Sequence, residues 1–429
     1  MYLYLWIVFI GFILFTALPL FSAKHRTVWK VVQVVVVTFS IILAVFVIEV
    51  LQIPPLPVII FVVIVSFLTD RSTYTKTGAI IVSVIVILIG GAAYYIFHDD
   101  PDYVQKYIDN NPDLASMHVS VDGESIVSEG ADMKRPLASV VKTIIAIEYA
   151  NQATKGTVDP GELIALEELE KFYLANTDGG AHPAWLDEMS ASNKIVNNEV
   201  PLHEVAKGMI MFSSNANTDF LIEKLGADSI NHVIEALDLE NHDPVYPVVS
   251  ALLVSEFVNE QHDGSLSSDE LKELLQSMSL EEYREIAWEV HDELKEGEAD
   301  FFHESVSIPM DLQKIWSDRL PNATVKDYGK VMRAISDNTA TVPGGEEVLR
   351  DVMEWPMELH ASNREMYAHF GAKGGSTAFV LNQALYVEDH KGKKVELIIF
   401  TEGFSFIEQI KISRNMNAFL IQVLDENLG

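Results

Sequence analysis

Hydrophobic and polar positions are distributed differently in two parts of the chain. The first 97 residues are dominated by four apolar stretches, at 2–22, 29–51, 54–69 and 77–97. The stretches 2–22, 29–51 and 77–97 have about the 20 residues that a helix needs to cross a bilayer, whereas 54–69 is shorter. A cleaved signal peptide is not expected, because the start carries no basic residue and the apolar stretches recur. The pattern therefore predicts about four transmembrane helices within residues 1–97.

The charges between these stretches predict an orientation. Basic residues occur in the first loop ("AKHRTVWK") and the third ("DRSTYTK"), whereas the second loop is uncharged and the exit "HDDPD" is acidic. Basic loops stay cytoplasmic, so everything after residue 98 is expected to face outward from the cell membrane. Ionisable residues do not lie well inside the stretches, since Glu49 is near an end. This favours a plain anchor over a transporter, with binding of a partner within the bilayer as the alternative.

Residues 98–429 have the mixed periodicity of a globular domain. "SMHVSVDGESIVSEG" places two alternating runs around Asp-Gly, which predicts a hairpin. Strands are expected again in "TAFVLNQALYVE" and "KVELIIFTEG", followed by an amphipathic helix. Strands at both ends with helices between them predict an α/β sandwich in which the two ends share one sheet. The intervening helical patterns cover 160–173, 201–224, 228–238, 247–260, 268–296 and 324–336.

Charge divides the chain in the same place. The whole chain has a net charge of −32, yet residues 1–97 carry five basic and two acidic groups, which leaves −35 for residues 98–429. Such acidity disfavours nucleic acid and anionic membrane surfaces as partners. The chain has no cysteine, so disulfides and thiolate chemistry are excluded. Residues 255–320 are especially acidic and are expected to form a helical insertion, with the run 268–299 as a solvated helical face.

Candidate chemistry begins with "PLASVVKTII", which places Ser139 three residues before Lys142. Positions i and i+3 share one face of a helix, so the two side chains would be neighbours. A serine hydroxyl is a weak nucleophile and needs a base, and a desolvated neutral lysine can serve as one. Taken alone, the pair also fits a helix lysine whose ammonium reaches out to solvent.

Two further motifs change this interpretation. "MFSSNANTDFLIEKLG" contains Ser213-Ser214-Asn215, and "HFGAKGGSTAFVLNQALYVE" contains Lys373-Gly374-Gly375-Ser376 immediately before a strand. Ser-x-x-Lys, Ser-x-Asn and Lys-x-Gly in this order form the signature of the penicillin-recognising serine enzymes. Residues 100–429 therefore resemble the class A β-lactamase-like family of serine hydrolases.

The resemblance implies four catalytic roles. Ser139 would be the nucleophile that forms an acyl-enzyme, and Lys142 its base or proton relay. Ser213 would pass a proton to the leaving nitrogen. Lys373 would attract the substrate carboxylate and help to keep Lys142 neutral.

The resemblance also implies a set of substrate-binding residues. Asn215 would bind the amide side chain of the substrate, and the backbone N–H groups of Ser139 and Ser376 would form the oxyanion hole. Gly374 and Gly375 would give the clearance that this hole needs, with Gly375 counted as part of the binding site. Ser376 and Thr377 would add hydroxyl contacts to the carboxylate.

Two positions depart from the family pattern. Gly374 stands where threonine or serine is usual, which removes one hydroxyl. The deacylating Glu-x-x-Leu-Asn is absent after the second motif, where "LDLENHDPVYPVVSALL" offers only Glu240, His242 and Asp243. These three are either a replacement for the missing carboxylate or part of a plain surface loop. Without a carboxylate on a water, the acyl-enzyme would turn over slowly.

The remaining polar and aromatic residues suggest little further chemistry. Thirteen histidines occur without a metal-ligand spacing, so neither a metal nor a cofactor is expected. Tyr173 or Trp185, near "DGGAHPAW", is a candidate for an aromatic at the edge of the cleft, with simple packing as the alternative.

We therefore expect a membrane-anchored, outward-facing serine hydrolase of β-lactamase-like fold. It would comprise a membrane module over 1–97, in contact with the lipid bilayer, and a hydrolase domain over 98–429. Its substrate would be a β-lactam or a D-alanyl peptide of the cell wall. The alternative is a non-enzymatic or slowly acylated penicillin-binding sensor or scaffold of the cell envelope.

Overall fold

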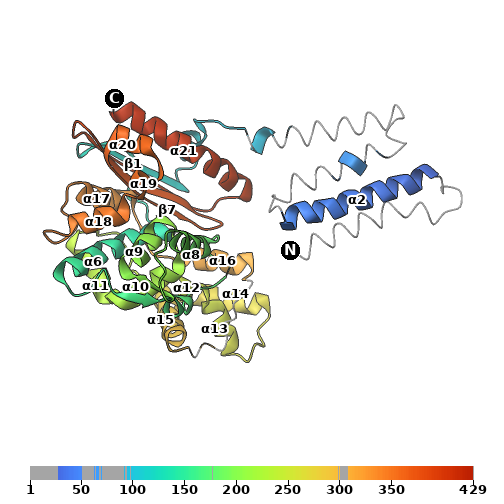
Figure 1. Cartoon of the computed structure of the whole chain (residues 1–429), viewed down its shortest axis with the longest axis horizontal. Helices are drawn as coiled ribbons and strands as arrows, with labels where there is room; N and C mark the ends of the chain where they lie inside the picture. The colour runs from blue at the N-terminus through green and yellow to red at the C-terminus, as the bar shows by residue number, and fades with distance from the viewer. Residues whose placement is uncertain are drawn as a thin grey trace. The chain divides into compact units, whose positions relative to one another are not determined.

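A computed structural model describes residues 28–50, 62, 64–66, 69, 91, 94–96, 98–175, 177–297, 299 and 308–428. The chain divides into two compact units, Met1–His98 and Asp99–Gly429 (Figure 1).

The first unit corrects the expectation of four transmembrane helices. The stretch 29–51 forms helix α2 (Val28–Val50), 2–22 lies outside the described residues, and only isolated residues of 54–69 and 77–97 are described. Among the described residues, no helix has the length and apolar character needed to span a membrane. α2 also uses a polar side chain for packing, since the buried Gln33 donates from Nε2 to Ser66 O at 3.2 Å. The apolar pattern was therefore insufficient to identify spanning helices.

The second unit is built on a five-stranded antiparallel sheet in the order β2-β1-β9-β8-β7. As expected, both ends of the domain contribute to it. Asp122 and Gly123, at φ of 48° and 84°, form the tight turn between the first two strands. The strands are β1 (Ala115–Val121), β2 (Glu124–Glu129), β7 (Tyr367–Ser376), β8 (Leu381–Asp389) and β9 (Lys394–Thr401).

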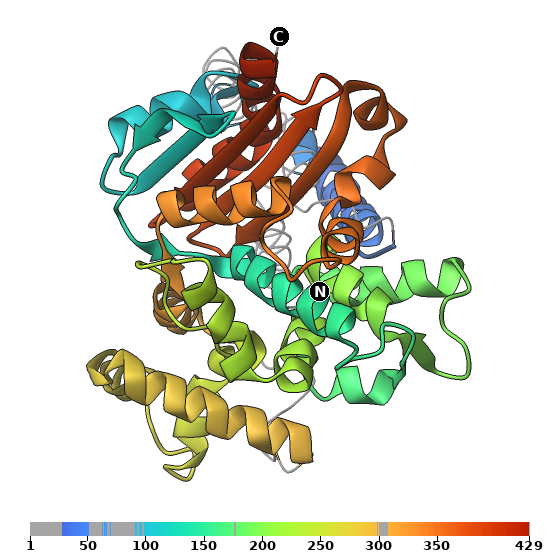
Figure 2. The same cartoon turned by 90° about the vertical axis from the view of Figure 1, so that its left-hand side faces the viewer.

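Helices cover both faces of the sheet. Side chains alternate between the two faces along each strand, and apolar residues on both faces are buried by these helices. In β9, Leu397 and Ile399 belong to the same core cluster as α21, whereas Ile398 and Phe400 belong to that of α17. Figure 2 shows α17 in orange across one face of the sheet and α21 in dark red on the other. The helices flanking the sheet are α5 (Tyr103–Asn110), α17 (Val325–Ser336), α18 (Glu346–Met353), α19 (Trp355–Leu359), α20 (Ala361–Met366) and α21 (Phe406–Leu428).

A helical subdomain lies between β2 and α17 in the sequence. It includes two small two-stranded sheets, β3 (Arg135–Pro136) with β6 (Asn322–Ala323), and β4 (Leu163–Ala165) with β5 (Glu199–Pro201). Its helices are η3 (Ala138–Val141), α6 (Lys142–Lys155), α7 (Leu166–Glu170), α8 (Ala181–Ala191), α9 (Leu202–Met211), α10 (Asn215–Leu225) and α11 (Ala227–Ala236).

The acidic region beyond α11 packs around a second hydrophobic core, to which Phe172, Leu174 and Ala216 also belong. The region comprises α12 (Val248–Leu252), α13 (Val254–Glu260), α14 (Ser268–Ser277), α15 (Leu280–Glu296) and α16 (Met310–Arg319). Leu271, Tyr283 and Leu312 are buried together there. Capping boxes at Ser267 and Ser279 start α14 and α15, so these acidic helices have well-defined N-termini.

Candidate active site

Ser139 lies in the 3₁₀ turn η3, directly ahead of α6. The preceding residue, Ala138, has a φ of 46°, an unusual conformation for a residue with a side chain. The buried Asn382 of β8 holds the turn, since its Nδ2 donates to Pro136 O at 2.7 Å and to Leu137 O at 3.1 Å. The sheet therefore fixes the backbone that presents Ser139.

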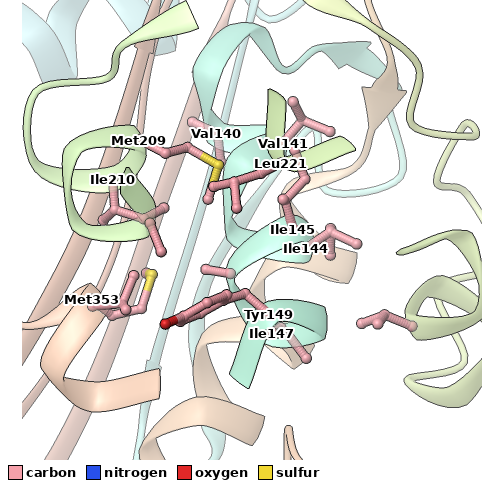
Figure 3. Packing of buried hydrophobic residues seen from close by; sticks show 14 of the residues in the cluster. Val140, Val141, Ile144, Ile145, Ile147, Tyr149, Met209, Ile210, Leu221 and Met353 are labelled. Carbon is pink, nitrogen blue, oxygen red and sulfur yellow. The ribbon is translucent and has the colours of Figure 1, made fainter. Parts of the chain in front are cut away.

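Helix α6 is buried almost completely, which is why its lysine is desolvated. Figure 3 shows Ile144, Ile145 and Tyr149 of α6 packed with Met209 and Leu221 from neighbouring helices. Lys142 is the first residue of α6 and is fully buried.

The second motif lies in the connection between α9 and α10. Ser213 has a φ of 68°, and Ser214 caps α10 by accepting a hydrogen bond at Oγ from Asn217 N. The fully buried His182 supports this turn, because its Nδ1 is 2.9 Å from Ser214 Oγ. Strained residues persist where their surroundings dictate the conformation, and they are common at functional sites.

The third motif forms the end of β7, at the edge of the sheet. Lys373 is buried, and the backbone at Gly375 lies directly against the turn that carries the serine. A Cβ at Gly375 would lie 2.6 Å from Leu137 O, 2.8 Å from Val140 N and 2.9 Å from Ser139 N. Only glycine allows β7 to approach this closely.

Both lysines converge on the hydroxyl of Ser213. Lys142 Nζ lies 3.3 Å from Ser213 Oγ and donates to Ser213 O at 2.6 Å and to Asn215 Oδ1 at 2.8 Å. Lys373 Nζ donates to Ser213 Oγ at 3.0 Å and to Gly374 O at 2.8 Å. Among the described residues, no hydrogen bond joins Ser139 Oγ to Lys142. The structure thus links the three motifs through Ser213.

Burial changes the protonation of this pair. Desolvation, and after it the charge of Lys373, holds the pKa of Lys142 well below its ordinary value, although Asp178 and Asp219 oppose the shift. Burial lowers the pKa of Lys373 to about 7. Burial thus favours the neutral amine at Lys142, and a neutral amine is able to accept a proton.

A cavity of about 470 Å³ opens beside the serine. It is lined by five of the residues identified from the sequence, namely Ser139, Ser213, Asn215, Ser376 and Thr377. Its other lining residues include Asp178, Phe212, Val248, Gln313, Trp316 and Gln409.

The three residues considered for the missing carboxylate do not line this cavity. Asp243 forms ion pairs with Lys134 and, at 3.2 Å, with Arg284. His242 is buried beside Tyr328 OH at 3.3 Å, and Glu240 is exposed. The stretch after the second motif contributes the apolar Val248 to the cavity.

The aromatic candidates are also placed elsewhere. Trp185 is fully buried, and its ring lies 5.4 Å from that of His182, which also contacts Tyr173 at 4.9 Å. The aromatic residues that line the cavity are Phe212 and Trp316.

Several functional candidates were missed by sequence reasoning. Asp178 stands in a loop, Gln313 and Trp316 come from α16, and Gln409 comes from α21, where its Nε2 donates to Thr377 O at 2.7 Å. The Thr377 hydroxyl is 2.7 Å from Ser317 Oγ. None of these residues belongs to a recognisable motif; only the Asp-Gly-Gly at 178–180 gives a signal, that of a turn. In the described part of the chain, no group of three or more histidine and acidic residues is arranged to hold a metal ion.

The model of the β-lactamase enzyme family matches residues 102–421. The chain belongs to this family. The α/β fold expected from the three motifs is thereby confirmed, and so is the coarse assignment as a serine hydrolase.

Similar solved structures include a β-lactamase from Sphaerobacter thermophilus, at 15% identity and a TM-score of 0.44, covering 76% of this chain and 98% of that one. A β-lactamase from Chitinophaga pinensis has 14% identity and a TM-score of 0.44, covering 75% and 99%. A variant of PBP-A, solved as an acyl-enzyme complex with penicillin G, has 15% identity and a TM-score of 0.41, covering 76% and 96%. No curated protein matches the chain.

Proposed function

We propose that this β-lactamase family member forms an acyl-enzyme at Ser139 with a β-lactam or a D-alanyl cell-wall peptide. The observation that carries the proposal is the position of Ser213 Oγ, 3.0 Å from Lys373 Nζ and 3.3 Å from Lys142 Nζ, in the cavity that also contains Ser139. This arrangement provides a nucleophile, a neutral amine and a hydroxyl that connects to a second amine.

Acylation would begin when Ser139 Oγ attacks the carbonyl carbon and its proton passes to neutral Lys142. The backbone N–H groups of Ser139 and Ser376 would stabilise the negative oxygen that develops. The C–N bond then breaks, and the leaving nitrogen takes a proton from the Ser213 hydroxyl. Ser213 regains a proton from Lys142, so the lysine is neutral again and the acyl group remains on Ser139.

Hydrolysis of this ester would be slow, because a general base must hold a water near the carbonyl. Among the described lining residues, Asp178 is the carboxylate of the cavity. Its oxygens already accept hydrogen bonds from the N–H groups of Gly180, Ala181 and His182 at 2.9–3.1 Å, which leaves fewer acceptor sites for a water.

The absence of any other carboxylate from the described lining of the cavity supports a second candidate function. A protein that is acylated and stays acylated can report the presence of a β-lactam, or hold a cell-wall peptide, without turning it over. The two candidates share the acylation step and differ in the release step. An extracytoplasmic location, which both candidates require for a cell-wall substrate, stays a prediction.

The proposal is tested by covalent labelling with a fluorescent penicillin. Ser139→Ala should abolish labelling and leave the thermal midpoint nearly unchanged, since the residue lines a cavity and loses one hydroxyl. Ser192→Ala, at the C-terminal end of α8, is the matched control and should label like the wild type. Labelling that persists in Ser139→Ala would overturn the assignment of the nucleophile.

A further inference from the structure

Asp178 is the single charged side chain among the described residues that line the 470 Å³ cavity. The rest of the lining is neutral: hydroxyls, amides, a backbone glycine and apolar groups such as Phe212, Val248 and Trp316. The amines of Lys142 and Lys373 are hydrogen-bonded to Ser213 Oγ, and neither lysine lines the cavity. A substrate in this cavity therefore meets a carboxylate directly and the lysines through a hydroxyl.

The Asp178 carboxylate is fixed in position by the start of α8. Oδ1 accepts from Gly180 N and Ala181 N, both at 3.1 Å, and Oδ2 accepts from His182 N at 2.9 Å. An ionised carboxylate has about four acceptor sites, so Oδ2 can still take one strong donor. The turn that allows this geometry includes Gly179 and Gly180 at φ of 68° and 85°. A rigid carboxylate with a free acceptor site favours a cationic donor.

The Asp178 carboxylate adjoins the turn that carries Asn215. Its Oδ2 accepts from His182 N at 2.9 Å, and His182 Nδ1 lies 2.9 Å from Ser214 Oγ, directly before Asn215. Lys373, by contrast, is on β7 together with Ser376. Because the carboxylate of a β-lactam or D-alanyl substrate lies on the leaving-group side, toward Lys373, the acyl side is the part that can approach Asp178.

We infer that the site prefers acyl donors that carry a cationic amine on the acyl side, and that Asp178 is the residue that recognises this amine. The inference rests on the proposed function and narrows its substrate class to zwitterions. Such a molecule presents its carboxylate to Lys373 and its ammonium to Asp178.

Three penicillins that share one nucleus and its carboxylate provide the test. On the acyl side, ampicillin carries an amine, benzylpenicillin carries no charge, and carbenicillin carries a second carboxylate. Their second-order acylation rates should be measured on the full chain in 1 M NaCl, where exposed charges are screened beyond about 3 Å. The wild type should prefer ampicillin over carbenicillin. Asp178→Asn should reduce this ratio by about fivefold, since a charge pair in a partly solvated site contributes modestly. Any effect of the substitution on Lys142 changes both acylation rates alike, so it cancels in the ratio of ampicillin to carbenicillin.

Asp187→Asn is the matched control, because it removes one carboxylate from the exposed side of the same helix. It should leave the ratio unchanged. A wild-type protein that acylates at equal rates with all three penicillins would overturn the inference while leaving the proposed function intact. A protein that none of them labels would overturn the proposed function itself.

Two measurements keep the test decisive if Asp178→Asn fails to fold. Asp178→Ser retains a side chain that can cap α8 and removes the charge. The wild-type preference for ampicillin should also disappear as the pH rises past about 8, where an α-amino group loses its proton. A preference that persists at higher pH would contradict recognition of a cation.

Discussion

The hydroxyl of Ser213 is the residue-scale feature on which the site depends. It lies within 3.3 Å of two buried amines, and its backbone has a φ of 68° that few residues with side chains adopt. The capping hydrogen bond from Asn217 N to Ser214 Oγ and the contact of His182 with the same hydroxyl hold this conformation. The strain at Ser213 is therefore maintained by neighbours that have no part in the chemistry.

The protonation of the two lysines predicts a bell-shaped pH dependence for acylation. The reaction needs neutral Lys142, so its rate should rise with pH through the lowered pKa of that residue. It also needs charged Lys373, whose pKa burial lowers to about 7, so the rate should fall above pH 7. Stopped-flow labelling with benzylpenicillin between pH 5 and 10 measures both limbs.

Lys373→Arg is the informative variant for this profile, because a guanidinium stays charged throughout the range. Its alkaline limb should move to higher pH even if the maximal rate is lower. A wild-type rate that keeps rising from pH 7 to pH 10 would show that Lys373 need not be charged.

At the scale of elements, the edge strand β7 and the turn η3 fit together at one residue. Gly375→Ala would place a Cβ within 3.0 Å of three backbone atoms, whereas a Cβ at Gly374 would be 3.2 Å from the flexible side chain of Gln383. Gly375→Ala should therefore separate β7 from Ser139 and lower the acylation rate about a hundredfold, the usual cost of a lost oxyanion donor. Gly374→Ala should stay within a few-fold of the wild type.

The thermal midpoint distinguishes local from general damage in this pair. Overpacking against the backbone costs about 1–3 kcal/mol, so Gly375→Ala should also melt at a lower temperature. Equal acylation rates for the two variants would mean that the close approach of β7 has no role in acylation.

The described part of the acidic insertion supplies no base for the release of the proposed acyl-enzyme. Its helix α16 contributes Gln313 and Trp316 to the cavity, Leu320 follows directly after the helix, and none of these can act as a base. Benzylpenicillin should therefore give a burst of about one equivalent of product, followed by a slow phase. Rapid multiple turnover would contradict this. Asp178→Asn would then show whether that carboxylate was the base, with Asp243→Asn as a control outside the cavity.

The sequence predicts some of these elements and not others for a physical reason. The hairpin at Asp122-Gly123 and the alternation in β8 and β9 depend on local backbone preferences, so they can be read from short segments. The three motifs can be read in the same way. Asp178, Gln313, Trp316 and Gln409 also line the cavity, and they come from three separate segments that meet only in the folded chain: the loop before α8, α16 and α21. The prediction of four transmembrane helices is wrong, because apolar length was taken as enough to define a spanning helix.

At the scale of the whole molecule, the net charge of −32 should govern how charged substrates approach. Interactions between exposed charges and a diffusing ligand extend over a Debye length, which shrinks from about 10 Å at 0.1 M salt to about 3 Å at 1 M. Raising NaCl over this range should speed acylation by the dianion carbenicillin about threefold, because repulsion is screened. Zwitterionic ampicillin should change little, and benzylpenicillin should lie between them.

The salt series also separates the global field from the local effect of Asp178, which lies in the cavity and is screened less than the surface. In Asp178→Asn, the acceleration of carbenicillin by salt should remain, since the variant changes the net charge by one unit among many. The preference for ampicillin over carbenicillin that the wild type retains at 1 M NaCl should be smaller in Asp178→Asn. If salt has no effect on carbenicillin, the acidic surface does not control access to the site, and its role must be sought in stability or solubility.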